Sequence, residues 1–186
     1  GAGGNGTVTV NDNGLVTVAN TTRLWSTGII NFNGGSLTTG SFDNSEAGAF
    51  NFHDGTLKVN GANGMFNPGT THFTIDGLAA HNLPALVIAN TASATLSGKL
   101  TVGFSNRGQL IVKAGSVVSN MKGHIGKRSG STGVATVKGS GSQWNNSGEL
   151  EVGRKGNGTL NIPHGGTVNV GSKTWVAREP SSVGAI

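Results

Sequence analysis

The chain has 186 residues, of which 33 are glycine and none is cysteine, and charged residues make up only 11 % of it. The absence of cysteine excludes a disulfide scaffold and a thiolate metal site, and no apolar run reaches the length of about 18 residues that a membrane helix needs. The formal net charge of +5 favours an anionic partner. The basic residues lack the interleaved aromatic residues with which single-strand binders stack bases, so we expect no nucleic-acid partner.

A glycine-rich chain of low charge could be disordered, but regularly spaced apolar pairs argue against this. Each pair has the i, i+2 spacing that places two side chains on one face of a strand. The pairs run along the whole chain: Val8/Val10, Val16/Val18, Ile30/Phe32, Phe50/Phe52, Leu57/Val59, Phe73/Ile75, Leu86/Ile88, Leu100/Val102, Leu110/Val112, Leu150/Val152, Leu160/Ile162 and Val168/Val170. Asn-Gly, Asp-Gly and Gly-Gly pairs separate many of them and supply the positive φ of tight corners.

An internal repeat distinguishes between the folds that suit such short strands. The segment 98–103 (GKLTVG) matches 148–153 (GELEVG), and 108–112 matches 158–162, both at an offset of 50 residues. An antiparallel barrel has no need of such an offset, whereas a solenoid stacks like on like. We therefore predict an all-β fold, a right-handed single-stranded parallel β-helix with roughly 25 residues per rung, two rungs making one repeat.

In chain order, the sequence divides a single solenoid domain into three stretches. Residues 1–75 carry degenerate repeats, residues 76–97 form an irregular rung or loop, and residues 98–186 carry the regular repeats of about 50 residues. Both termini fall within repeat-like sequence, so we expect a piece of a longer protein. We also expect end-to-end stacking, either on neighbouring repeats of a parent chain or between separate copies, because open solenoid ends expose unpaired backbone groups.

The segments 126–144, 148–153, 158–162 and 165–168 together resemble a known repeat. It is the β-strand repeat shared by autotransporter (type V secretion) passengers and by bacterial surface proteins with a PEP-type sorting signal. The resemblance covers residues 98–186 most fully. It implies an exported bacterial β-helix located extracellularly or at the cell surface, and it carries no common catalytic residues.

Three further features of the sequence bear on catalytic or cofactor chemistry. Residues 1–6 match the dinucleotide fingerprint G-x-G-x-x-G, but a strand-like segment follows where that fingerprint needs a helix. The five histidines lack zinc-ligand spacing, so we expect no metal and no cofactor. An acid-dependent polysaccharide lyase or hydrolase would need clustered carboxylates, and the chain has only eight acids. If an active site existed, it would involve His53, Asp54, His72 and Asp76, but polar turn residues are the favoured interpretation.

Basic residues and tryptophans predict a possible glycan- or anion-binding surface in the C-terminal half. Its candidate members are Lys127, Arg128, Trp144, Arg154, Lys155, Trp175 and Arg178. For Trp25, Trp144 and Trp175 themselves, a structural role in filling a corner or capping a rung is favoured over stacking against sugars. We expect a structural or adhesive, self-assembling surface protein that is not an enzyme, with an acidic-polysaccharide-binding module as the alternative and a polysaccharide lyase or hydrolase as the least favoured.

Overall fold

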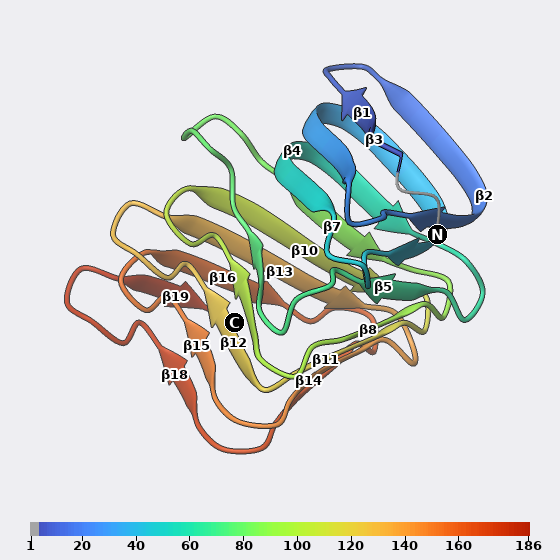
Figure 1. Cartoon of the computed structure of the whole chain (residues 1–186). Coiled ribbons are helices and arrows are strands. Elements are labelled where there is room, and N and C mark those ends of the chain that lie inside the picture. Colours follow the sequence, from blue (N-terminus) through green and yellow to red (C-terminus); the bar gives the residue numbers. More distant parts are fainter. Residues whose placement is uncertain (1–3) are drawn as a thin grey trace.

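The chain winds into coils that stack along one axis, so that each face is a ladder of strands from successive coils (Figure 1). The structure is a computed structural model that describes residues 4–186, and these residues contain strands and no helix. The coils form a parallel β-solenoid of about eight turns whose equivalent positions lie about 24 residues apart. The predicted fold class is thereby confirmed. Residues 1–3, which begin the glycine motif at residues 1–6, lie outside the described residues.

The coils have three faces, which we call the first, second and third face in their order along a coil that starts at Leu15. The first face is built by parts of β2 (Leu15–Arg23), β3 (Gly28–Asp43) and β4 (Ala49–Val59), followed by β7 (Ala85–Ile88), β10 (Arg107–Lys113), β13 (Thr132–Lys138), β16 (Asn157–Asn161) and β19 (Val183–Ala185). The second face contains the ends of β2 and β3, then β5 (Met65–Asn67), β8 (Ser93–Thr95), β11 (Val117–Asn120), β14 (Gln143–Asn146) and β17 (Thr167–Val170).

The third face carries the positions used below for the candidate site. It begins with β1 (Gly6–Val10), which pairs with the start of β3, and continues in a separate sheet of β6 (Phe73–Ile75), β9 (Lys99–Val102), β12 (Lys122–Ile125), β15 (Leu150–Val152) and β18 (Thr174–Val176). Every strand pair on these faces is parallel within residues 4–186, as the solenoid prediction required.

Strand register explains the 50-residue sequence repeat. Leu110 on β10 pairs with Ala135 on β13, which in turn pairs with Leu160 on β16. Each step advances 25 residues, so 50 residues correspond to two coils. In the N-terminal half the step is shorter, since Leu37 pairs with Leu57 after 20 residues.

Alternation along each strand decides which side chains fill the coil. In β10 and β13 every second residue is buried, and the buried set includes Leu110, Val112, Ala135 and Val137. Side chains of a strand point alternately to its two faces, so each L-x-V pair contributes two groups to the interior. Apolar burial of this kind, at roughly 25 cal/mol per Å², is the main force that holds the coils together.

The irregular stretch is narrower than the predicted range of residues 76–97. Residues 76–84 form no strand, but β7 and β8 within that range lie in register with their neighbours. Leu57 pairs with Leu86 after 29 residues, so the excursion adds residues without breaking the stack. The carboxylate of Asp54 holds this loop by accepting bonds from Leu83 N (3.0 Å) and Asn82 Nδ2 (2.8 Å).

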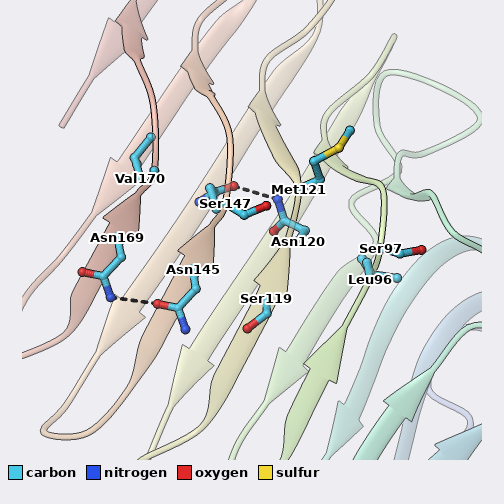
Figure 2. A pocket seen from close by; sticks show the side chains of 11 residues that line it. Leu96, Ser97, Ser119, Asn120, Met121, Asn145, Ser147, Asn169 and Val170 are labelled. Atoms are coloured by element: carbon cyan, nitrogen blue, oxygen red, sulfur yellow. Dashed lines mark hydrogen bonds between the residues drawn. The ribbon is translucent and has the colours of Figure 1, made fainter.

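Amide side chains connect equivalent positions of successive coils. Asn51 donates to Asn31 at 2.8 Å, and Asn169 donates to Asn145 at 2.8 Å, the latter pair shown in Figure 2. Inside the coil, Asn120 donates to Asn146 at 2.7 Å. Ladders of this type add side-chain hydrogen bonds to those of the backbone between stacked parallel strands.

Candidate functional site

The candidate site is built on the turns that follow the third face, which we call the basic turns. They comprise residues 126–131 and 153–156, with the equivalent turns 103–106 and 177–182 on either side. Lys127 N donates to Gly103 O, Arg154 N to Gly126 O, and Arg178 N to Gly153 O, at 2.9 to 3.0 Å. The backbone therefore places these three residues at equivalent positions of successive coils, with their backbone atoms about 4.8 Å apart.

A glycine starts each of the inner turns because the chain there needs a left-handed conformation. Gly126 has φ 69°, and a Cβ at this position would lie 2.3 Å from the carbonyl oxygen of Asn157. Gly153 has φ 70° and an equally close neighbour. Glycine adopts this conformation without the steric cost that other residues meet. The pairs Gly126-Lys127 and Gly153-Arg154 thus specify a turn in which a basic side chain follows the glycine.

Four cations converge on one shallow groove of about 170 Å³. Lys127 and Arg128 line it from one coil, and Arg154 and Lys155 line it from the next. The ring of Phe104 on the preceding turn lies beneath Arg128 at 4.2 Å and Lys127 at 5.0 Å from its centroid. Cation–π contacts of this length orient the two side chains. The structure brings these four predicted residues together.

A buried carboxylate, that of Glu151, lies beneath the basic turns and pairs with basic side chains around it. Glu151 occupies the outward position of β15, yet its side chain has 0 % exposure. Its Oε1 pairs with Arg178 Nη1 and lies 3.3 Å from Lys122 Nζ, while its Oε2 lies 3.2 Å from His124 Nε2. Lys122 also binds Glu149 at 2.7 Å. Long side chains from three successive coils thus cover one carboxylate.

Burial and charge set opposite protonation preferences for the two central groups. Burial, which disfavours an ionised imidazole, lowers the pKa of His124 from 6.5 to about 4, against the attraction of Glu151. Burial alone would raise the pKa of Glu151, but His124, Lys122 and Arg154 outweigh it and hold that pKa below its usual 4.5. At neutral pH the cluster therefore contains a neutral imidazole and an ionised carboxylate.

The predicted tryptophan members of the surface need correction. Trp144 is fully buried inside the coil and donates from Nε1 to Asn120 Oδ1 at 2.6 Å, so it is not part of any outer binding surface. Its strand, QWNN, has no apolar alternation that would have indicated which residues point inward. Trp175 is half-buried, and its ring lies under Arg178 at 5.0 Å and Lys173 at 5.7 Å. Arg178 joins the cluster through Glu151 and lies outside the four-residue groove.

The four residues considered for an active site act on turns and strands instead of forming one cluster. Asp76 accepts bonds from the backbone N–H groups of Phe104, Ser105 and Asn106 at 2.8 to 3.0 Å, and so shapes the turn that carries Phe104. Asp54 holds the loop at residues 76–84, and His72 Nδ1 accepts from Lys99 N at 2.9 Å. No side-chain hydrogen bond is present for His53 among the described residues.

A second surface depression lies where the second face turns into the third. It has a volume of about 720 Å³, and Figure 2 shows its lining side chains, among them Ser119, Asn145 and Asn169 at equivalent positions of three coils. This polar row was not predicted as a site, and neither were Glu151, His124 and Lys122. For Glu151 the sequence did offer a signal, because an acidic residue stands between the two apolar residues of the strand segment GELEV.

No metal cluster, membrane helix or known relative identifies this chain within its described residues. Within residues 4–186 no group of three or more histidine, cysteine or acidic side chains could hold a metal ion, and no helix in that range is long and apolar enough to cross a membrane. No family model matches the chain, and no curated protein and no solved structure matches it significantly.

Proposed function

We propose that this chain is a stiff structural segment of an exported bacterial surface or matrix protein, with an adhesive role. One observation carries the proposal: the first face is a continuous parallel ladder from β2 to β19, with no break even where residues 76–84 leave the coil. A rod in which each coil binds the next through backbone bonds and amide ladders has no hinge about which to bend. The resemblance of residues 98–186 to exported surface repeats supports the cellular location.

The absence of cysteine permits a direct test of both parts of this proposal. Ser45→Cys and Ser172→Cys would introduce spin labels at exposed turns after β3 and β17, which are five strand steps apart. Five steps of about 4.8 Å place the two positions ~24 Å apart along the axis. A stiff rod gives one narrow distance distribution by pulsed electron paramagnetic resonance, whereas a broad distribution would contradict the structural role.

The same cysteines test the location. A membrane-impermeant maleimide dye should label the Ser172→Cys protein on intact cells of the producing bacterium. A buried matched position, Ser142→Cys, should stay unlabelled until the protein is unfolded, because Ser142 is fully buried. Labelling of Ser172→Cys only after cell lysis would contradict export.

A further inference from the structure

The basic turns form a charged row that the structural role leaves unused. On these turns five cations, Lys127, Arg128, Arg154, Lys155 and Arg178, accompany only one carboxylate, that of the half-buried Glu179. Counting the buried Glu151 as well, the local charge is five positive minus two negative, or +3. The row therefore holds most of the excess charge of the whole chain, which is +5.

The cations of the basic turns lie close enough to repel one another. Lys127 is half-buried, and burial, followed by the neighbouring charges of Lys99 and Arg154, lowers its pKa below 10.5. The opposing attraction of Glu151 is weaker than these effects, and Arg128 adds to them. A bound anion would relieve this repulsion, and such convergence of like charges in a groove is typical of anion-binding surfaces.

The spacing of the row indicates the shape of the anion. Its positions repeat at the coil separation of about 4.8 Å, parallel to the solenoid axis. That distance is close to the length of one sugar unit in an extended pyranose chain. Arginine forks at Arg128 and Arg154 suit bidentate contact with carboxylates. We propose that the basic turns bind a linear polysaccharide that carries a carboxylate on each sugar, with the chain running along the solenoid axis.

The aromatic side chains favour a polysaccharide over a single-stranded nucleic acid. Bases would need open aromatic faces for stacking. Arg128 and Lys127 lie over the ring of Phe104, and Arg178 and Lys173 lie over the ring of Trp175. Charge is therefore what this surface presents to a ligand.

Two triple variants test the proposal. The first, Lys127→Ser/Arg128→Ser/Lys155→Ser, removes groove cations that make no side-chain hydrogen bond or ion pair within the described residues. The matched control, Lys58→Ser/Lys113→Ser/Lys138→Ser, removes the same charge from strands β4, β10 and β13 on the first face. Far-UV circular dichroism and the thermal midpoint establish that both variants fold.

Calorimetric titration with oligogalacturonates of increasing length provides the readout. We expect the groove variant to bind at least roughly tenfold more weakly and the control to stay within about twofold, because a few charge-assisted contacts account for such factors. Affinity should rise with length and level off once the oligomer spans the basic turns.

Three results would overturn the proposal. Equal losses in both triple variants would mean that net charge alone attracts the polymer. Equal binding of neutral dextran would exclude recognition of carboxylates. Tighter binding of an oligonucleotide of equal charge, lost in the groove variant, would assign the surface to nucleic acid instead. None of these results would alter the distance distribution that tests the structural role.

Discussion

Six phenylalanine rings pack against one another in the N-terminal coils, whereas the coils after residue 98 enclose one tryptophan among aliphatic side chains. The outer surfaces differ as well. In the N-terminal half the corner after the third face is the segment 53–55, and in the C-terminal half the turns are longer, namely 103–106, 126–131 and 153–156. The two halves share one parallel ladder but differ in coil length, and the longer C-terminal coils have room for the basic turns.

The largest expected effect comes from removing the single aromatic of the C-terminal coils. Trp144→Ala should lower the free energy of unfolding by about 3–5 kcal/mol, because it leaves a large cavity. It also deprives the buried Asn120 Oδ1 of its donor. Phe66→Ala should cost toward the lower end of that range, since neighbouring rings at 5.1 and 5.7 Å can relax toward the cavity. Urea denaturation measures both.

The exposed Trp25, with 48 % of its surface accessible, is the control for aromatic removal. Trp25→Ala should change stability by less than about 1 kcal/mol, as surface substitutions usually do. A similarly small effect of Trp144→Ala would contradict the view that one side chain holds the C-terminal interior together.

The ion pairs of the two halves should differ nearly as much. Glu151→Gln leaves Lys122 and Arg178 without their shared buried carboxylate, and breaking a buried pair from one side costs about 3 kcal/mol or more. In the N-terminal half, Arg23 and Glu46 are 45 % and 44 % exposed at their side chains, so Glu46→Gln should cost about 0–1 kcal/mol. Comparable losses in urea denaturation would mean that Glu151 is not effectively buried.

Acid should weaken the C-terminal half before the N-terminal half. The pKa of His124 is about 4 in the fold and near 6.5 when unfolded, so the unfolded chain binds more protons between these values. Stability therefore falls as pH drops from about 6.5 to about 4, by an amount on the order of 3 kcal/mol. The pKa of Asp54 lies below 3.8, so its contribution is lost only at lower pH.

Hydrogen exchange across this pH range, read separately for strands β12–β15 and β3–β4, measures the difference. His124→Gln should flatten the C-terminal profile, whereas His164→Gln, at an exposed position, should leave it unchanged. An unaltered profile in His124→Gln would show that the imidazole is not the titrating group.

The fold was predictable because its cause is periodic. Apolar i, i+2 pairs fix which side chains face inward, and the 50-residue offset reflects two coils in register, as Leu110, Ala135 and Leu160 show. The basic groove was partly predictable for the same reason, since Lys127 and Arg154 are about one coil apart.

The buried part of the site was not predictable, because its burial depends on neighbouring coils. The middle position of an L-x-V strand normally faces solvent, and Glu151 is covered only by long side chains such as Arg178 and Lys122. Trp144 was misassigned to the surface for a related reason: the space that it fills is provided by a glycine on a different face, Gly123.

The contact between Gly123 and Trp144 gives the smallest of the expected losses of stability. Gly123 occupies an inward position of the third face, where its neighbour in register is Leu150. A Cβ at Gly123 would lie 2.5 Å from Asn146 Oδ1, 2.7 Å from Leu150 Cδ1 and 3.1 Å from Trp144 Cζ2. Gly123→Ala should therefore cost about 1–3 kcal/mol through overpacking. A Cβ at Gly6, in the N-terminal half, would have no atom within 4 Å, so Gly6→Ala should cost far less.

A double-mutant cycle separates complementarity from ordinary crowding. In a Trp144→Leu background the smaller side chain removes the 3.1 Å contact but leaves those with Asn146 Oδ1 and Leu150 Cδ1. Gly123→Ala should therefore cost less than in the parent protein but should still destabilise. Coupled neighbours show interaction energies of about 0.5–3 kcal/mol, which urea denaturation of the four proteins resolves. Additive costs would mean that Asn146 and Leu150, and not the tryptophan, require a glycine at position 123.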